Sequence, residues 1–375
     1  MKIGFDAKRI THNKTGLGNY SRYIVNILSA FYPDNSYELY SPSEGNPRLH
    51  ALVKETPSVQ FHYPSGLFTW IPTAFWRSFA LTSVLKEDSV GLFHGLSNEL
   101  PYGLKSRNIK SVVTIHDLIF LRYPQFYRRI DRVIYTNKFL RACKEADCII
   151  AISEMTKRDI IRFFNIDADK IHVIYQGCDL SFTHPAEEER KALVRSAYNL
   201  PKRYILNVGS IEKRKNLLLV IKALKQVDED VSLVAIGKRT EYTDQLEKYI
   251  MDNDLSKRVR LLDGVPFEDL PAIYQQASLF VYPSFFEGFG IPIIEALHSG
   301  IPVIAATGSC LEEAGGPDSI YVNPNNESDM AQSINSVLSS PVLAEKMIKA
   351  GKEYVQNFSD KTIARQLMEL YKGLL

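Results

Sequence analysis

The sequence has few cysteines and no long apolar run, and each shortage excludes a class of protein. Its four cysteines (Cys143, Cys148, Cys178 and Cys310) form no Cys-x-x-Cys pair, so we expect reduced and buried thiols. No apolar run reaches about 18 residues, the length that a membrane-spanning helix needs. The start, MKIGFDAKRI, lacks the apolar segment of a signal peptide. Together these absences predict a cytoplasmic protein.

Net charge is also small, at +2 for 375 residues, but it is unevenly distributed. Residues 1–182 contain 23 Lys and Arg against 17 Asp and Glu, whereas residues 183–375 contain 22 against 26. A basic first half suits an anionic partner or a membrane surface, although an ordinary fluctuation in surface charge would give the same numbers. The 45% hydrophobic and 23% charged fractions are typical of a globular protein, and the length fits two domains.

Short apolar strands alternate with longer helical patterns, which is typical of parallel sheets with helices on both faces. The sequence therefore predicts an α/β protein. In the first half we expect helices at 19–31, 72–86, 127–146 and 154–164, the last capped by Ser153. Strands are expected at 2–7, 37–41, 58–63, 92–95, 111–117, 148–153 and 171–177.

A charged, proline-flanked segment at 184–203 interrupts this pattern, and a second series follows it. We predict one domain at 1–183, a second at 200–356 and a last helix within 357–375. Ligands of open α/β sheets bind beyond the carboxyl ends of the strands, and the distinctive residues of this sequence fall at such ends. The second series has expected strands at 204–210, 231–237, 259–264, 279–284 and 302–306, and expected helices beginning near 216, 242, 292, 327, 342 and 360.

Two glutamates are the most informative residues, in the segment PSFFEGFGIPIIEAL. Glu287 and Glu295 are separated by seven residues, with a turn rich in Gly and Pro between them. Pro292 fits the first position of a helix, so Glu287 is expected in a loop and Glu295 about one turn into that helix. The free N–H groups of the helix start would form an anion site between the two carboxylates. This arrangement suits a sugar, a diphosphate and a ribose.

Two further loops carry phosphate-binding features. In KTGLGNY, Gly16 and Gly18 follow the first strand and allow the backbone to approach a phosphate, although a simple tight turn is the alternative. Ser21 replaces the third glycine of a dinucleotide fingerprint, which disfavours a nicotinamide cofactor. In GSIEKRKN, Arg214 and Lys215 precede a helix start, where cations and free N–H groups converge. A solvated charged face is the alternative there.

The run from strand FVYPS through FEGFG to helix IPIIEAL resembles the E-x7-E motif of retaining glycosyltransferase family 4 (group 1), which has the GT-B fold. This resemblance covers essentially the whole chain and is strongest at 204–216 and 258–300. It implies two Rossmann-like parallel-sheet domains facing across a cleft. The N-terminal domain would bind the acceptor and the C-terminal domain the nucleotide-sugar donor, with the last helix crossing back to the first domain.

The resemblance also implies roles for individual residues. Lys215 would neutralise the donor diphosphate, and Arg214 would supply the charge that many members place where this chain has Ser210. Glu287 would hold sugar hydroxyls, Glu295 the ribose, and His116 would lie near the reaction centre. The expected catalytic residues are His116, Glu287 and Lys215, and the expected donor-binding residues are Gly16, Gly18, Ser210, Arg214, Lys215, Val265, Glu287, Gly288, Phe289, Gly290, Ile291 and Glu295.

The implied activity is metal-independent transfer, with retention, of a mannose-type hexose from a nucleoside diphosphate sugar of GDP or UDP type. The implied acceptor is a saccharide or lipid-linked saccharide, as in surface polysaccharide synthesis. We expect no further cofactor, no metal and no nucleic acid, and we assign no Asp-x-Asp pair to a metal. Two alternatives stay open, namely a sugar-nucleotide epimerase of the same fold, which would turn over the donor without an acceptor, and a non-catalytic scaffold.

Aromatic and basic residues in the first half suit peripheral contact with the cytoplasmic membrane. Segment 66–86 holds both tryptophans and an apolar stripe that includes Phe75, Trp76 and Phe79, although a buried core gives the same stripe. The helix expected near 126–146 is rich in cations. They are Arg128, Arg129, Arg132, Lys138, Arg141 and Lys144.

Overall fold

The computed structural model describes residues 1–66 and 70–375 and divides the chain into two compact units. The first consists of Met1–Gln176 together with Ser359–Leu375, and the second of Gly177–Phe358. The division therefore falls a few residues before the segment 184–203 in which the sequence changes character. The C-terminal helix α17 (Asp360–Leu374) is grouped with the first unit.

The first unit contains a sheet of seven parallel strands in the order β3-β2-β1-β4-β5-β6-β7. The order reverses between β1 and β4, and that reversal is the switch point at which Rossmann-like sheets bind ligands. The strand expected at 171–177 has only three residues. The strands are β1 (Lys2–Asp6), β2 (Ser36–Tyr40), β3 (Val59–His62), β4 (Leu92–Gly95), β5 (Lys110–Ile115), β6 (Cys148–Ala151) and β7 (Ile171–Val173).

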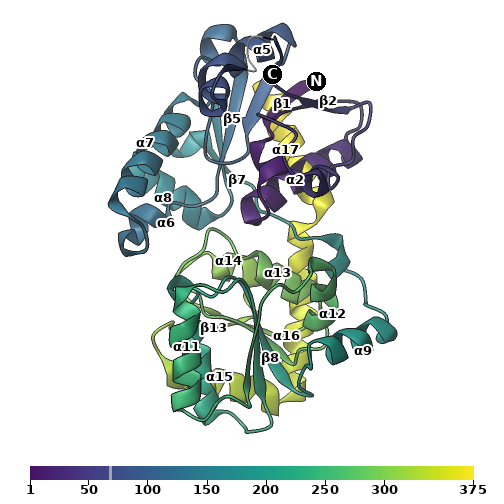
Figure 1. Ribbon diagram of the computed structural model, residues 1–375, viewed down its shortest axis with the longest axis vertical. Coiled ribbons are helices and arrows are strands. Elements are labelled where there is room, and N and C mark those ends of the chain that lie inside the picture. Colours follow the sequence, from purple (N-terminus) through teal and green to yellow (C-terminus); the bar gives the residue numbers. More distant parts are fainter. Residues whose placement is uncertain (67–69) are drawn as a thin grey trace. The chain divides into compact units, whose positions relative to one another are not determined.

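Helix α17 is built into the first unit beside α2 (Gly16–Phe31), as the yellow and purple ribbons of Figure 1 show. The Tyr23 hydroxyl donates to Asp360 at 2.8 Å, and the Tyr371 hydroxyl lies 2.6 Å from His94 Nδ1. The other helices of this unit are α1 (Lys8–His12), α3 (Pro47–His50), α4 (Thr73–Phe75), α5 (Leu81–Glu87), α6 (Ile119–Arg122), α7 (Arg129–Glu145) and α8 (Glu154–Phe164).

The helix expected at 72–86 is interrupted. A π-helical turn, Trp76–Ala80, separates α4 from α5, and an extra residue in a turn rotates the side chains that follow it. The expected apolar stripe is therefore split: Trp76 is 1% exposed, whereas Phe75 and Phe79 are 51% and 48% exposed. Residues 67–69, which belong to the aromatic segment 66–86, lie outside the described residues.

The second unit contains six parallel strands in the order β10-β9-β8-β11-β12-β13. The sequence did not indicate β13, because three residues are too short to show an alternation. The strands are β8 (Tyr204–Val208), β9 (Ser232–Ile236), β10 (Val259–Leu262), β11 (Leu279–Tyr282), β12 (Val303–Ala306) and β13 (Ile320–Val322). The helices are α9 (Glu188–Ala197), α10 (Leu217–Ala223), α11 (Glu241–Asp252), α12 (Leu270–Tyr274), α13 (Ile291–His298), α14 (Leu311–Gly315), α15 (Glu327–Ser339) and α16 (Pro341–Tyr354).

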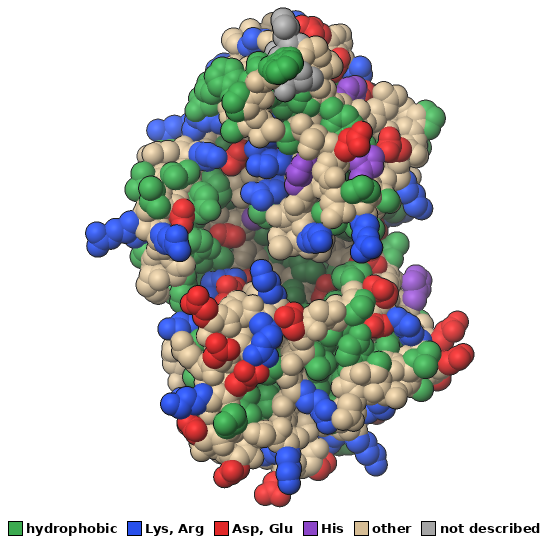
Figure 2. Space-filling view, viewed as in Figure 1, with side chains coloured by type: hydrophobic (Ala, Val, Ile, Leu, Met, Phe, Trp, Pro, Cys, Tyr) green, Lys and Arg blue, Asp and Glu red, His purple; other side chains and the backbone are tan. Residues whose placement is uncertain are grey.

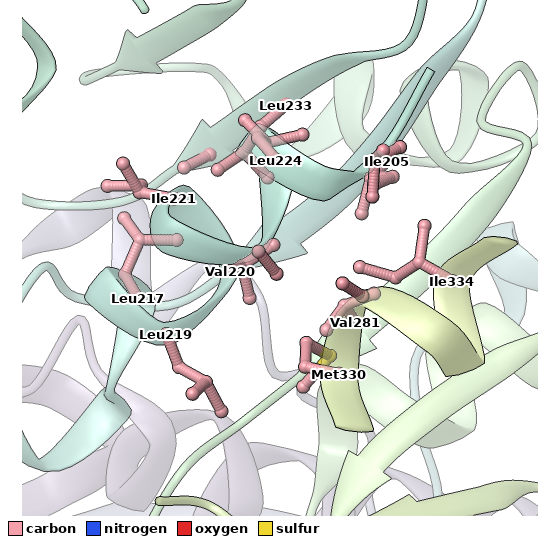
Figure 3. Close-up of a cluster of buried hydrophobic side chains, with 14 of the residues drawn as sticks. Ile205, Leu217, Leu219, Val220, Ile221, Leu224, Leu233, Val281, Met330 and Ile334 are labelled. Atoms are coloured by element: carbon pink, nitrogen blue, oxygen red, sulfur yellow. The ribbon is translucent and has the colours of Figure 1, made fainter. Parts of the chain in front are cut away.

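Helices α10 and α15 cover one face of this second sheet (Figure 3). Val220 of α10 and Ile334 of α15 are fully buried, as is Val281 of β11. Strands covered on both faces read as continuous apolar runs, which is why LFVY and VIAA were recognisable. The predicted α/β fold with two parallel-sheet domains is confirmed.

Candidate active site

Glu287 is the centre of a charged cluster in the second unit, in the loop between β11 and α13. Lys215 Nζ lies 2.7 Å from Glu287 Oε1, and Arg214 Nη1 lies 2.9 Å from Oε2. The Ser284 hydroxyl also donates to Oε1 at 2.6 Å, and the Tyr282 hydroxyl lies 3.3 Å from it. Both cations stand after β8, the neighbour of β11 at the point where the strand order reverses.

Glycines at two neighbouring strand ends allow this cluster to form. Gly209 has φ +153°, a backbone conformation that favours glycine, and the stem of Lys215 lies at van der Waals distance, about 3.7 Å, from where a Cβ would stand. A Cβ on Gly237 would lie 1.8 Å from the Gly209 carbonyl oxygen, so the loops after β8 and β9 touch backbone to backbone. Asn216 adopts the left-handed conformation and donates to the carbonyls of Pro283 and Pro324 at 3.1 and 2.8 Å. These contacts tie the Lys213–Lys215 turn to the end of β11.

Arg214 is held on three sides. Its Nη1 donates to the Phe286 carbonyl at 2.6 Å, its Nη2 donates to Glu212 at 2.8 Å, and its own carbonyl accepts from the Phe285 N–H at 2.9 Å. Ser210 reaches the same network, since its hydroxyl donates to Glu212 at 3.2 Å. Arg214 and Lys215, which the sequence suggested as a pair, therefore meet at one carboxylate.

The cluster fixes the charge state of its members. Burial disfavours ionisation of Glu287, but the charges of Lys215 and Arg214 outweigh burial and lower its pKa to about 2. Burial likewise opposes the charge of Lys215, and the neighbouring Glu287 carboxylate raises the pKa of Lys215 above its usual range. At neutral pH the cluster is thus a carboxylate between two cations.

Glu295 has a different environment. It lies in the second turn of α13, 8% exposed, and its Oε2 accepts from the Tyr274 hydroxyl at 2.8 Å. Burial raises the pKa of Glu295 to about 7, and the Tyr274 hydrogen bond only partly opposes this shift. The two glutamates of the motif therefore differ in ionisation, one always charged and one titrating near neutral pH.

The loop that joins the two glutamates offers backbone rather than side chains. The Phe289 ring packs edge-on against Phe358 with 5.4 Å between centroids, and the Cys310 thiol lies 3.0 and 2.9 Å from the carbonyls of Glu287 and Phe289. Gly290 has φ +148°, and α13 begins at Ile291, so Pro292 is the second helical residue rather than the first. Among the described residues, no side chain caps α13.

The remaining expected donor-binding residue of this unit, Val265, lies in the loop after β10, at the same carboxyl edge of the sheet. It is partly exposed and follows Gly264, which has φ +69°. Gly288 belongs to the loop after β11. The structure thus brings Ser210, Arg214, Lys215 and Glu287 into one network, whereas Val265 and Glu295 belong to separate parts of the same unit.

His116 belongs to the first unit, directly after β5. Its Nε2 lies 2.9 Å from the Leu96 carbonyl, its backbone N–H donates to Asn98 Oδ1 at 2.9 Å, and its ring meets the edge of Tyr20 at 4.7 Å. Burial lowers the pKa of His116 to about 4, and the charge of Arg9 acts in the same direction. The imidazole is therefore neutral at physiological pH, with Nε2–H as donor to Leu96.

Gly16 and Gly18 are helical, in the first turn of α2, rather than in a loop before it as expected. A Cβ on Gly18 would lie 2.0 Å from the Asn13 carbonyl oxygen, so glycine is needed there for packing against the preceding loop. Around Gly16, no described atom lies within 4 Å of a Cβ position. The Asn13 side chain accepts from the N–H groups of Thr15 and Gly18 at 2.8 and 3.3 Å, which satisfies part of the helix start.

Sequence reasoning missed four side chains that support the glutamates: Tyr274, Tyr282, Ser284 and Cys310. Tyr282 and Ser284 flank Pro283 at the end of β11, and their position four and two residues before Phe286 was the only signal. Tyr274 and Cys310 come from α12 and from the residue before α14, two short helices that showed no clear periodicity.

The sequence contains three Asp-x-Asp triplets, at 167–169, 228–230 and 252–254, and the structure gives other partners to residues of the first two. Asp167 caps the turn Ala168–Lys170, and Asp228 and Asp230 face Arg203 at 3.9 and 3.2 Å. Within residues 1–66 and 70–375, no three His, Cys, Asp or Glu side chains gather as a metal site would require.

Two family models match this chain in succession. Residues 21–182 match "Glycosyltransferase Family 4", and residues 186–354 match "Glycosyl transferases group 1". The chain belongs to this glycosyltransferase family. The glycosyltransferase interpretation of the E-x7-E segment is thereby confirmed at the level of the family, and the enzyme is a transferase.

The glycosyltransferase has one relative that is similar along its whole length and another that is similar over part of it. The "O-antigen chain mannosyltransferase B" of Escherichia coli is 26% identical, and the alignment covers 100% of both chains. The "O-antigen chain mannosyltransferase RfbU" of Salmonella typhimurium is 30% identical over 61% of each chain.

Solved structures share the fold. Sucrose-phosphate synthase from Thermosynechococcus elongatus superposes with a TM-score of 0.80 at 23% identity, covering 100% of this chain and 99% of that one. HepE of Anabaena, solved in complex with UDP, has a TM-score of 0.77 at 18% identity over 100% of both chains. These likenesses support the GT-B fold.

Proposed function

We propose that this glycosyltransferase moves mannose, with retention of configuration and without a metal ion, from GDP-mannose to a saccharide acceptor in surface polysaccharide synthesis. The observation that carries the proposal is the convergence of Lys215 Nζ and Arg214 Nη1, at 2.7 and 2.9 Å, on the Glu287 carboxylate. This convergence stands at a sheet switch point, the place where α/β enzymes bind ligands.

The hardest charge in such a transfer develops on the departing diphosphate. Lys215 and Arg214 are fixed by Glu287, Glu212 and backbone carbonyls, so they need no reorganisation when that charge forms. The N-terminal N–H groups of α13 add donors directed to the same edge. These groups supply the positive charge that a divalent ion would otherwise provide.

Glu287 and Glu295 divide the donor between them in this proposal. Glu287 stays ionised and can accept hydrogen bonds from sugar hydroxyls through charge-assisted contacts. Glu295, with its pKa near 7, would bind the ribose hydroxyls together with Tyr274. His116, which is neutral, would position the sugar through hydrogen bonds rather than through charge.

Retention follows from the absence of a suitable base or nucleophile in this charge set. Glu287 contacts two cations, and their charges make its basicity low, although Oε2 can still accept a hydrogen bond from a sugar hydroxyl. We therefore assign the proton of the acceptor hydroxyl to the leaving phosphate, on the face from which that phosphate departs. The new bond then forms on the same face as the old one.

The mannose assignment rests on similarity. The Escherichia coli and Salmonella typhimurium relatives are named as O-antigen chain mannosyltransferases, and the first is similar over the full length of this chain. We extend this by proposing GDP as the nucleotide and a saccharide, free or lipid-linked, as the acceptor.

The test is a transfer assay with GDP-mannose, UDP-glucose and UDP-galactose, each with and without EDTA, on a mannose-terminated oligosaccharide with an apolar aglycone. We expect product from GDP-mannose alone, with the α configuration by NMR coupling constants and no loss on chelation. Lys215→Ala should lower kcat/KM at least about a hundredfold, as removal of one preorganised donor does. The control Lys222→Ala, at a partly exposed lysine of α10 that pairs with Glu327, should not. A β-linked product would exclude retention, and loss of activity with EDTA would exclude metal independence.

We also propose peripheral contact of the first unit with an anionic membrane. On α7, Ile130 and Val133 are 67% and 61% exposed at helical spacing, and Arg128 and Arg129 stand beside them. Figure 2 shows hydrophobic and basic side chains together on the visible surface where Figure 1 places α7. Apolar side chains inserted at a headgroup layer with cations around them favour binding to acidic lipids. In the part of the chain that the structure describes, no helix is both long and apolar enough to span a bilayer.

Flotation with phosphatidylglycerol-containing and neutral vesicles tests this contact. Binding should occur only to the acidic vesicles and should weaken in the double variant Ile130→Glu, Val133→Glu. The matched control is Val342→Glu, because Val342 is 79% exposed on α16 of the second unit. Equal flotation of all three proteins would contradict the proposed surface.

A further inference from the structure

The first unit has a cavity of its own at its switch point. Its volume is about 140 Å³, and its polar lining comes from Asp6, Arg77, Glu99, Asn137, Lys138 and Arg141. Asp6 ends β1, and Glu99 follows β4, the two neighbouring strands between which the order of this sheet reverses. The cavity and the Glu287 cluster therefore occupy equivalent positions in their own sheets, at the carboxyl edge where the strand order reverses.

A chain of ion pairs crosses this cavity. Arg77 Nη2 pairs with Asp6, lies 3.6 Å from Glu99 Oε2, and leaves its own Nε buried without a hydrogen-bond partner among the described residues. Lys138 Nζ lies 3.3 Å from Glu99 Oε1. The Arg77–Glu99 separation exceeds a hydrogen bond, so a hydroxyl group inserted there could donate to Glu99 and accept from Arg77.

Tyr102 orients Arg141, the third cation that lines the cavity. The Arg141 guanidinium lies 3.7 Å from the centroid of the Tyr102 ring, and that ring stacks on Phe79 at 4.7 Å. Arg141 also donates to the Leu100 carbonyl and lies 2.8 Å from Glu145. The cation is therefore held flat and rigid, as a binding site requires.

The charges favour a neutral polyol over an anion. Three cations and two carboxylates line the cavity, and each carboxylate already contacts a cation. A phosphate would find its cations compensated and two carboxylates opposing it. A carboxylate has about four lone-pair sites, so Asp6 and Glu99 can still accept from hydroxyl groups. The volume is well below the roughly 300–1,000 Å³ of clefts for drug-sized ligands, which suits one sugar ring.

We propose that this cavity binds one sugar residue of the acceptor, with the hydroxyl groups of that residue held by Glu99, Arg77 and Asn137. The assignment rests on the proposed transferase function and names a subsite for its second substrate. Glu99 and Asn137 determine which sugar binds. The Glu99 carboxylate accepts a hydrogen bond from one hydroxyl group of the sugar, and the Asn137 amide bonds to a neighbouring hydroxyl group. Neither residue belongs to the donor cluster of the second unit.

Binding of simple glycosides to the full-length protein tests the assignment. Methyl α-glycosides of mannose, glucose, galactose and rhamnose, and separately inorganic phosphate, are titrated by ligand-observed NMR and calorimetry. At least one glycoside should bind saturably, and Glu99→Gln and Asn137→Ala should each weaken it about tenfold, since a hydrogen bond to a charged or polar partner is lost. Glu87→Gln, the same change at an exposed residue of α5, should leave the affinity within twofold.

The sign of the Glu99→Gln effect separates a sugar from an anion. A sugar should bind more weakly to the variant, whereas phosphate should bind more tightly because an opposing charge is gone; tighter phosphate binding with no glycoside effect overturns the proposal. In the transfer assay both variants should raise the acceptor KM while kcat and GDP affinity stay within about threefold. If no glycoside binds while GDP does, the subsite is refuted and the donor site stands; if GDP does not bind either, the proposed function itself fails.

Discussion

Replacing Glu287 by glutamine should lower the stability of the protein without lowering its affinity for a nucleoside diphosphate. The pKa of Glu287 falls from 4.5 to about 2, because the charges of Lys215 and Arg214 outweigh the effect of burial. A difference of about 2.5 units corresponds to about 3 kcal/mol of folding free energy at neutral pH. Glutamine keeps the shape of the side chain but leaves Lys215 without its carboxylate partner and Arg214 with Glu212 alone, and removing one partner of a buried ion pair costs about 3–5 kcal/mol.

The pH dependence of this difference has a definite sign. The pKa of Glu287 is lowered in the folded state. Its contribution to the free energy of unfolding is therefore fully present above pH 4.5 and is lost as the pH falls towards 2. The gap in unfolding free energy between the wild type and Glu287→Gln should therefore be about 3 kcal/mol at pH 7 and about half of that near pH 3. Urea denaturation followed by fluorescence at several pH values measures it.

Diphosphate binding gives the second readout. With the Glu287 charge removed, Lys215 loses its carboxylate partner and Arg214 keeps only Glu212, so GDP should stabilise Glu287→Gln at least as strongly as the wild type. Transfer of the sugar should nevertheless fall at least about a hundredfold. The control Glu345→Gln, at an exposed position of α16, should change stability by less than about 0.5 kcal/mol. Unchanged stability together with weaker GDP binding would refute the account of a carboxylate clamped by two cations.

Three further outcomes follow from other contacts. Burial raises the pKa of Glu295 to about 7, so its contribution to the free energy of unfolding is present below pH 4.5 and is lost as the pH rises through 7. In urea denaturation, the free energy of unfolding of the wild type should therefore fall by about 2 kcal/mol relative to Glu295→Gln between pH 5 and pH 8. Gly18→Ala should lower the melting temperature by several degrees, because its Cβ would lie 2.0 Å from the Asn13 carbonyl oxygen, whereas Gly16→Ala has open space and should not; equal melting temperatures would contradict this. Asn216→Ala should cost about 2–4 kcal/mol by loss of two buried hydrogen bonds and strain at φ +57°, and Asn216→Gly should cost less because glycine suits that φ.

The sequence predicted those parts of the site that depend on local pattern. Strand β11, the turn FEGFG and the amphipathic start of α13 are contiguous, so the place of Glu287 in a loop and of Glu295 in a helix could be read from one segment. The pairing of Lys215 with Glu287 is not local, since 72 residues separate them. The sequence did not predict this ion pair; it predicted only that both residues lie at one edge of the sheet, because both follow apolar strands and parallel strands end at the same edge.

Other parts of the structure had no such signal. The turn at Trp76–Ala80 is π-helical, and hydrophobic spacing cannot distinguish an extra residue in a turn from a regular helix. Gly18 was interpreted as making room for a phosphate, but its immediate neighbour is the Asn13 backbone, a contact that depends on how α1 folds onto α2. Tyr274 and Cys310 approach the motif from two short helices, and only the tertiary fold brings them to Glu295 and to the loop after Glu287.

The two sheets carry opposite charge arrangements on the same topology. At the switch point of the second unit, one carboxylate, Glu287, stands between two cations, Lys215 and Arg214. At the switch point of the first unit, one guanidinium, Arg77, stands between two carboxylates, Asp6 and Glu99. Two cations that converge on one carboxylate suit a diphosphate, which can share both of them, whereas two carboxylates that converge on one guanidinium keep lone pairs for hydroxyl donors. A transferase that joins a charged donor to a neutral acceptor needs both kinds of site, and the same sheet topology provides a place for each.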